Sequence, residues 1–213
     1  MEYKQFKGSH DIINRSKYLV KNPKELKNNW SKEFKNNNPI HLELGTGYGD
    51  FIINMAIKNP KINFIGLEIS EDQLVKAVGK LNNKDLPNLR LICGDAGNII
   101  DFFGKEIDTI YLTFSEPWPK GHDEKRRFTH KGYLSLYDRI FKKQKHIILK
   151  TDNKGLFEYS LVSLSEYWYS FRKVSLDLHK DEELSKQNVM TDWEKQCEKQ
   201  HLPIYYVDAY FNN

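Results

Sequence analysis

The chain has 213 residues, of which 39% are hydrophobic, 29% charged and 13% aromatic, and its formal net charge is only +4. This composition is typical of a single globular domain and excludes a disordered chain, and no apolar run approaches the roughly 20 residues of a membrane-spanning helix. The two cysteines form no metal-binding or disulfide pattern, so we expect a cytoplasmic protein that binds neither a metal nor a membrane.

Positive charge is concentrated in two segments of the chain. Residues 1–38 carry nine Lys and Arg against four acidic residues, and residues 117–151 carry ten against three. Such clustering is expected of a nucleic-acid-binding surface, although a solvated lysine-rich surface would give the same counts. We interpret residues 1–38 as a basic N-terminal extension, partly helical over 23–34, that orders when nucleic acid binds. Residues 39–213 are interpreted as a single domain.

From Pro39 onward, short apolar runs alternate with segments of helical periodicity. The runs are rich in Ile and Leu and are bounded by Gly, Pro or Asn, which predicts strands. Alternation of strands and helices predicts an α/β fold, with a mostly parallel seven-stranded sheet and helices on both faces. The predicted strands are residues 40–44, 63–68, 89–93, 108–114, 146–150, 171–178 and 204–211.

The helices between these strands have recognisable ends. The first, residues 50–59, stops before Pro60, and the second starts at Ser70, with Gln73 three residues later as a capping box. Thr129 is predicted to cap a third helix that extends to Ile140. Two more helices are predicted over 154–165 and 191–199, and a flexible polar loop over 181–188.

A glycine-rich segment, Glu43-Leu44-Gly45-Thr46-Gly47-Tyr48-Gly49, joins the first strand to the first helix. Glycines there let the backbone turn sharply and approach a ligand closely. The spacing is G-x-G-x-G rather than the dinucleotide G-x-G-x-x-G, and an acid precedes it. That acid suits a cation such as the aminium group of a methionine moiety and is unfavourable beside a pyrophosphate. A simple tight turn would need the same glycines, so this segment alone identifies no ligand.

Two further acids end the next two predicted strands. Glu68, 19 residues after Gly49, could accept both hydroxyls of a ribose, and Asp95 could accept a hydrogen bond from an adenine amino group. Each acid alone is also consistent with an exposed strand end. Parallel strands end at one edge of a sheet, where ligands of open α/β folds bind. Together with Glu43, these acids therefore predict a site for an adenosyl cofactor.

The fourth predicted strand leads into Glu116-Pro117-Trp118-Pro119-Lys120, followed by Lys125-Arg126-Arg127. The two prolines stiffen the turn that carries Trp118, whose ring either stacks on a base or, as we favour, packs to fix the loop. Here the chain resembles the bacterial tRNA (guanine-N7-)-methyltransferase family, from about Pro39 to the C-terminus. The other motifs of the resemblance are Glu43-Leu44-Gly45-Thr46-Gly47, Gly66-Leu67-Glu68, Gly94-Asp95-Ala96, Lys150-Thr151-Asp152-Asn153, and Thr191 with Glu194.

The resemblance implies a Rossmann-like class I methyltransferase fold. The sequence leaves open whether the protein is a monomer or a homodimer. The resemblance also implies transfer of a methyl group from S-adenosylmethionine to N7 of the guanine at position 46 in the variable loop of tRNA. N7 has a free lone pair and no proton to lose, so the reaction needs orientation and charge stabilisation rather than a strong base. The implied roles are cofactor binding by Glu43, Gly45, Gly47, Glu68 and Asp95, catalysis by Glu116, guanine or nucleotide binding by Lys120, Asp152, Thr191 and Glu194, and phosphate contacts by Lys125, Arg126 and Arg127.

The sequence departs from the family pattern at the substrate segment. The family has Asp-Pro-Trp-Pro-Lys followed by Lys-Arg-His, whereas this chain has Glu116 in place of the Asp and Gly121-His122-Asp123 in place of Lys-Arg-His. The extra methylene moves the carboxylate by about an ångström, which can cost on the order of 100-fold in rate. One alternative is therefore a tRNA-binding protein with weakened catalysis. Another, a methyltransferase of small molecules or proteins, is disfavoured by the basic segments.

Overall fold

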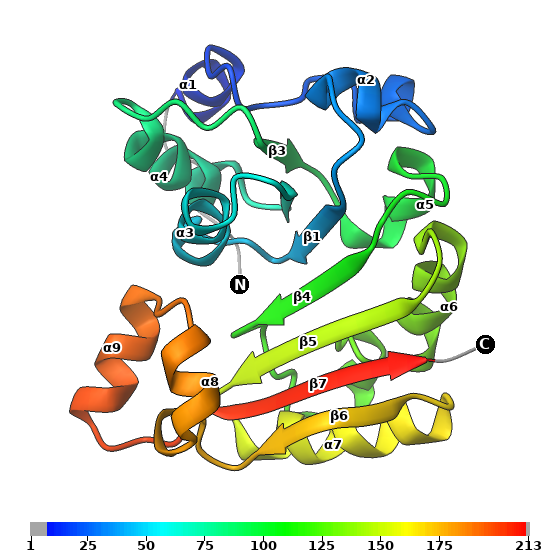
Figure 1. Cartoon of the computed structure of the whole chain (residues 1–213), viewed down its shortest axis with the longest axis vertical. Helices are drawn as coiled ribbons and strands as arrows, with labels where there is room; N and C mark the ends of the chain where they lie inside the picture. The colour runs from blue at the N-terminus through cyan, green and yellow to red at the C-terminus, as the bar shows by residue number, and fades with distance from the viewer. Residues whose placement is uncertain (1–7, 212–213) are drawn as a thin grey trace.

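The computed structural model describes residues 8–211, and these form one sheet flanked by helices (Figure 1). The strands are β1 Ile40–Leu44, β2 Asn63–Glu68, β3 Leu89–Cys93, β4 Thr109–Thr113, β5 Lys145–Thr151, β6 Ser170–Ser175 and β7 Tyr205–Phe211. Their order is β3-β2-β1-β4-β5-β7-β6; the first five are parallel, and β7 is antiparallel to both of its neighbours. The predicted α/β fold with a mostly parallel seven-stranded sheet is confirmed.

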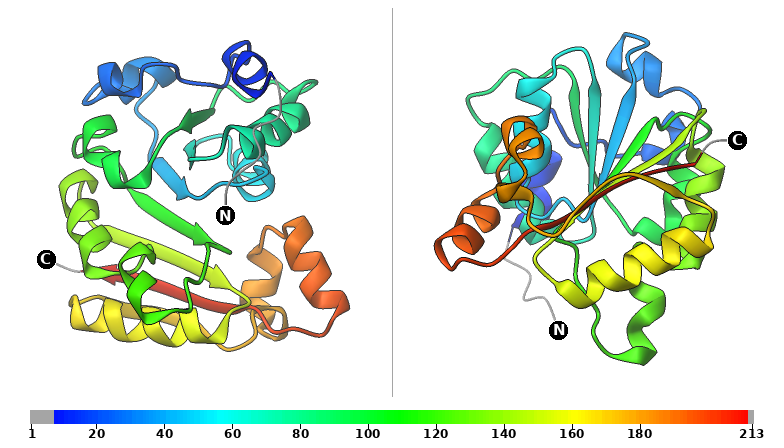
Figure 2. Two further views of the ribbon diagram at one scale, coloured as in Figure 1. Left: turned by 180° about the vertical axis from the view of Figure 1, so that it is seen from behind. Right: turned by 60° about the horizontal axis from the view of Figure 1, so that its bottom comes forward.

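Helices cover both faces of this sheet, as the right-hand view of Figure 2 shows. One face carries α1 Ser9–Asn14, α3 Asp50–Lys58 and α4 Glu71–Leu81, and the other carries α5 Ile99–Phe102, α6 Lys131–Ile140 and α7 Lys154–Glu166. Strand side chains alternate between the two faces: Leu42 and Leu44 join one core, whereas Phe64 and Leu91 join the other. The short elements are 3-10 helices at Pro23–Leu26, Ala96–Asn98, Gly121–Arg126 and Leu178–Lys180, and helices α2 Trp30–Phe34, α8 Glu182–Gln187 and α9 Asp192–Lys199.

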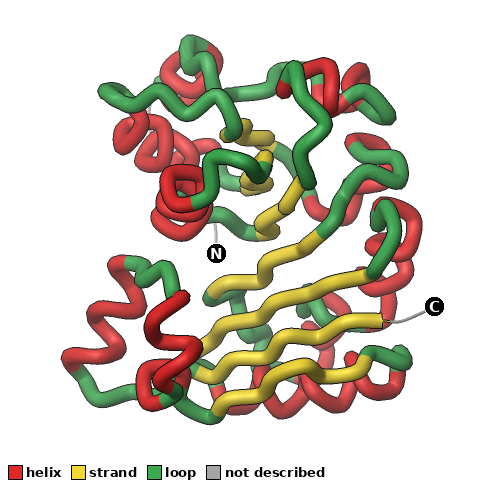
Figure 3. Tube along the Cα trace, viewed as in Figure 1, coloured by secondary structure: helices red, strands yellow, loops and turns green. Residues whose placement is uncertain are grey.

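The carboxyl ends of the parallel strands meet at one edge of the sheet. In Figure 1 the arrowheads of β4 and β5 point to this edge, where α8 and α9 lie across from α3. The tube in Figure 3 shows that loops and these two helices gather there. Within residues 8–211, no helix combines the length and the apolar character needed to cross a membrane.

The described part of the basic N-terminal segment packs on the domain. Trp30 is fully buried in the main core, and its indole N–H donates to the carbonyl of Phe102 at 2.9 Å. Residues 18–20 lie alongside β3, since Val20 N donates to Leu91 O and Leu91 N to Tyr18 O. That this segment orders when nucleic acid binds stays a prediction. Its few apolar side chains are spread among lysines and give no periodic signal, so the sequence did not reveal these contacts. Residues 1–7 lie outside the described residues.

Two local predictions from the sequence were wrong, and one helix cap was correct. Ser70 caps α4, accepting from Gln73 N at 3.4 Å, as predicted, but Ser70 N donates to Glu68, so the reciprocal half of the predicted capping box is not formed. His130 caps α6 in place of Thr129, whose buried hydroxyl bonds to Ser160 of α7 instead. The predicted loop over 181–188 contains helix α8, capped by the carboxylate of Asp181. It is short and has no apolar stripe, so periodicity could not show it.

Candidate active site

A cavity of about 830 Å³ opens at the carboxyl edge of the parallel strands. That volume lies within the range of cofactor and substrate pockets. The loops after β1, β2, β3, β4 and β5 all contribute to its lining, as does the segment at the start of α9. Of the residues predicted from the sequence, it is lined by Glu43, Gly45, Gly47, Glu68, Asp95, Glu116, Arg126, Asp152 and Thr191.

The glycine-rich loop needs its glycines for backbone geometry and for space. Gly45, Gly47 and Gly49 have φ angles of 72°, 55° and 76°, in the left-handed region that disfavours other residues. A Cβ on Gly49 would lie 2.8 Å from the Cβ of Ala77 in α4, too close for any side chain. The loop therefore turns tightly against α4 and leaves its backbone facing the cavity.

Glu68 connects this loop to the end of β2. One of its carboxylate oxygens accepts from Gly47 N and the other from Ser70 N, both at 2.9 Å. Asp95, at the end of β3, accepts from Gly97 N at 2.7 Å. Carboxylates accept several hydrogen bonds each, so both side chains keep capacity for a ligand. The structure thus places them side by side along the edge, on the wall formed by the loops after β2 and β3.

Glu43 is buried behind the same loop, with partners that the sequence did not suggest. Only 1% of its surface is exposed, and the hydroxyls of Thr46 and Thr113 donate to its two oxygens. Burial raises the pKa of Glu43 to about 8, an effect that these two hydrogen bonds and the Lys150 ammonium oppose. Glu43 is therefore largely protonated at pH 7, even with the Lys150 ammonium nearby.

The opposite wall of the cavity carries two carboxylates that no residue of the described chain engages by hydrogen bond or ion pair. Glu116 is exposed, two residues beyond Phe114, whose φ of 51° turns the chain away from the strand direction. Asp152 is half-buried at the end of β5. Both line the cavity. Free carboxylates beside a cofactor pocket can accept the N–H donors of a base and stabilise developing positive charge.

The three basic residues predicted to contact phosphate differ in the structure. The guanidinium of Arg127 donates to the carbonyls of Pro117 and Trp118, so it holds the loop. The guanidinium of Arg126 stacks 3.4 Å from the centroid of the Trp118 ring at the cavity wall. Lys125 is exposed outside the cavity, as is Lys120, which was expected to contact the substrate.

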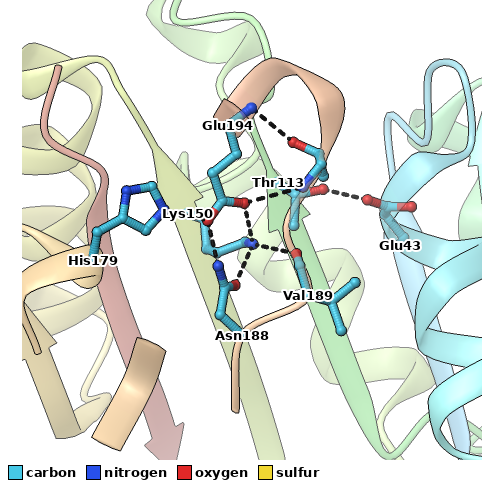
Figure 4. Close-up of polar contacts among 8 residues, drawn as sticks. Glu43, Thr113, Lys150, His179, Asn188, Val189 and Glu194 are labelled. Carbon is cyan, nitrogen blue, oxygen red and sulfur yellow. Dashed lines mark hydrogen bonds and ion pairs between the residues drawn. The ribbon is translucent and has the colours of Figure 1, made fainter. Parts of the chain in front are cut away.

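Glu194, also predicted to bind the substrate, does not line the cavity. It is fully buried and forms an ion pair of 2.9 Å with Lys150, whose side chain is 3% exposed (Figure 4). Burial alone would raise the pKa of Glu194, but Lys150 and further hydrogen bonds hold it below its ordinary value. Glu194 and Thr191 also form the capping box at the start of α9.

Sequence reasoning missed several aromatic side chains in the cavity wall. Tyr48 is 47% exposed, with the ammonium of Lys76 4.1 Å from its ring centroid. Phe128 and Tyr133 meet edge to face at 5.2 Å and also line the cavity. The position of Tyr48 between two loop glycines was a usable signal. No sequence signal predicted the positions of Phe128 and Tyr133, because these depend on how α6 packs.

Within residues 8–211, no cluster of His, Cys, Asp or Glu could hold a metal ion.

Comparison with known proteins gives matches over most of the chain. Residues 37–207 match a family model described as a putative methyltransferase. The tRNA (guanine-N(7)-)-methyltransferase of Lactococcus lactis subsp. cremoris (strain SK11) is 43% identical over 213 residues, covering 99% of this chain and 98% of that protein. The protein of the same name from Listeria welshimeri is 46% identical over 194 residues, covering 91% of this chain and 90% of that protein.

Solved structures with the same fold are more distant in sequence. A structure described as an antibiotic-related methyltransferase matches with a TM-score of 0.65 at 19% identity, covering 86% of this chain and 93% of that one. The 16S rRNA methyltransferase KamB matches with a TM-score of 0.65 at 13% identity over the same shares of the two chains. At such low identity these structures establish the Rossmann-like methyltransferase fold alone.

Proposed function

The chain belongs to the family of tRNA (guanine-N(7)-)-methyltransferases, and we propose that it methylates N7 of the guanine at position 46 in the tRNA variable loop, using S-adenosylmethionine. The observation that carries this proposal is the two-sided cavity. Glu68 and Asp95 lie along one wall, and the unpaired carboxylates of Glu116 and Asp152 lie along the other. Acting on tRNA, the enzyme works in the cytoplasm.

The first wall fits the cofactor. The left-handed backbone at Gly45 and Gly47 brings main-chain atoms close to the bound molecule, where a side chain would intrude. Glu68 accepts the ribose hydroxyls, and Asp95 accepts from the adenine amino group. S-adenosylmethionine supplies an electrophilic methyl group on a sulfonium. Glu43 lies behind the loop and becomes ionised when positive charge occupies the cavity, because a nearby cation lowers the pKa of a buried carboxyl.

The second wall fits the guanine. Because N7 already has a free lone pair, these side chains need only orient the ring and offset the positive charge that develops on it. Asp152 accepts from the N1 and N2 donors of the base in this proposal, and it lines the cavity together with Glu116, which precedes Trp118 in the same loop. Exposed Lys120 and Lys125 contact phosphate beyond the cavity mouth, which positions the tRNA without reading its sequence.

The proposal is tested with an unmodified tRNA transcript and S-adenosylmethionine labelled in the methyl group. We expect label on N7 of guanine 46, detected by cleavage at 7-methylguanine and by nucleoside mass spectrometry. The matched control is a transcript with adenine at position 46, which should take up no label. Label retained in that control, or found on another atom, would overturn the assigned substrate position.

A further inference from the structure

The ammonium group of Lys150 is enclosed near the end of β5 and has a full set of partners. It donates to Glu194 Oε2 at 2.9 Å, to Asn188 Oδ1 at 2.9 Å and to the carbonyl of Val189 at 3.1 Å. An ammonium has three donors, so none is left for a ligand. The ring centroid of Phe51 lies 5.1 Å away and completes the enclosure.

The carboxylate of Glu194 is equally occupied. Oε2 accepts from Lys150 and lies 3.4 Å from Thr191 N, whereas Oε1 accepts from the side-chain amide of Asn188 and lies 3.0 Å from His179 Nε2. Figure 4 shows Lys150, Asn188 and His179 around this carboxylate. A guanine could reach Glu194 only by displacing one of them.

These contacts fix a surface segment to the sheet. Asn188, Val189 and Glu194 belong to the connection between α8 and α9 and to α9 itself, and all three contact one lysine of β5. Thr191 and Trp193, from the same segment, line the cavity: Thr191 is buried as the cap of α9, whereas Trp193 is exposed. On its other side Lys150 is paired in register with Thr113, which donates to Glu43. The ion pair therefore lies between Glu43, which is behind the glycine-rich loop, and the segment that carries Thr191 and Trp193.

We propose, on the premise of the proposed function, that Lys150 and Glu194 are positioning residues whose buried ion pair sets the place of Thr191 and Trp193 against the substrate. Neither side chain touches the guanine. Substrate contact by this segment comes from these two cavity-lining residues, and Glu194 acts through them. This reassigns Glu194, which the resemblance implied to be a direct substrate contact.

The test is a double-mutant cycle of Lys150→Gln, Glu194→Gln and the double variant, in the full-length protein. Each single change leaves a buried charge without its partner, whereas the double change leaves two neutral side chains that can bond to each other. We expect each single variant to lower kcat/KM for tRNA on the order of 100-fold, with the Kd for S-adenosylmethionine changed less than about threefold. The double variant should recover at least about tenfold over either single variant.

Direct contact of Glu194 with guanine predicts a different result. The double variant would then be no more active than Glu194→Gln, because the missing carboxylate could not be replaced, and that outcome overturns the proposal. An inactive wild-type protein would instead overturn the proposed function, so the two failures are distinguishable. A ligated tRNA with inosine at position 46 adds a second readout. The fold loss in kcat/KM that Glu194→Gln causes should be the same on this tRNA as on tRNA with guanine at position 46. A smaller loss on the inosine tRNA would indicate contact with the N2 amino group.

Asn188→Ala keeps the proposal testable if the charge variants fail to fold. Asn188 is half-buried and bonds to both members of the ion pair, so its removal loosens the segment while both charges stay paired. We expect a folded protein with kcat/KM for tRNA about tenfold lower. Its amide hydrogen exchange should be faster in α8 and α9 and unchanged in α3 and α4. Wild-type kcat/KM in this variant would overturn the proposal.

Discussion

Arg127 donates a hydrogen bond of 2.9 Å to the backbone carbonyl of Trp118, a residue held at a left-handed φ of 44°. Positive φ is unfavourable for a bulky side chain, so the surrounding contacts must maintain it. The guanidinium also stacks over the ring of Tyr159, with 4.3 Å to its centroid. Arg127 is thus part of the loop's internal support, whereas Lys125, two residues earlier, is exposed.

Replacing Arg127 by Gln should therefore impair positioning rather than electrostatic attraction. We expect kcat to fall about 10- to 100-fold because the Trp118 loop loses its support beside the reacting atoms. The slope of log tRNA affinity against log salt should stay at its wild-type value, since no phosphate contact is lost. Kinetics and salt titration of one preparation measure both quantities. A slope reduced by about one unit would show that Arg127 contacts phosphate after all.

Lys125→Ala should have the opposite effect. The exposed side chain is expected to neutralise one phosphate, so its loss should weaken tRNA binding and reduce the salt slope by about one unit. The matched control is Lys142→Ala, an exposed lysine after α6, at the other edge of the sheet. We expect that variant to bind tRNA like the wild type at every salt concentration. Equal effects of the two substitutions would mean that Lys125 does not direct the RNA to the cavity mouth.

Binding of S-adenosylmethionine should release a proton from Glu43. Its pKa in the free protein is about 8, so the carboxyl is mostly protonated at pH 7, and a cationic ligand lowers that pKa. Affinity should accordingly rise as pH increases toward 8 and level off above it. Calorimetry in two buffers of different ionisation enthalpy measures the release, expected to approach about one proton at pH 7. Glu43→Gln should abolish it, and an unchanged release in that variant would assign the proton to another group.

Trp30→Ala should strongly destabilise the protein. The indole is fully buried in the main core although it belongs to the basic N-terminal segment. We expect the free energy of unfolding to fall by about 3–5 kcal/mol in urea titrations. Trp168→Ala is the control, because that side chain is 82% exposed and should cost less than about 0.5 kcal/mol. A small, equal effect of both substitutions would mean that residues 8–38 are not part of the folded core.

The fold could be predicted because its signals are local. Short Ile- and Leu-rich runs between helical segments gave the strands, and parallel pairing follows from the helices that connect them. The place of Glu68 and Asp95 in the cavity lining followed in turn, because Glu68 ends β2 and Asp95 follows the end of the adjacent strand β3.

The remaining features depend on contacts between distant segments. Glu194 is buried because it meets Lys150, 44 residues earlier, and nothing near either residue in the sequence reveals that pairing. The three consecutive basic residues 125–127 are equivalent in the sequence pattern, but in the folded loop Arg127 donates to the carbonyl of Trp118. Packing of this kind is decided by the tertiary structure, so local patterns predicted the positions of these side chains poorly.

We propose that Glu116 acts beside the reacting atoms in a cavity that also binds the cofactor. Single-turnover methyl transfer to guanine 46, compared between the wild type and Glu116→Ala, tests it most directly, with both Kd values measured on the same preparations. We expect the rate of N7 methylation to fall on the order of 100-fold, while the Kd values for tRNA and S-adenosylmethionine stay within about threefold. Methylation by Glu116→Ala at the wild-type rate would contradict this account.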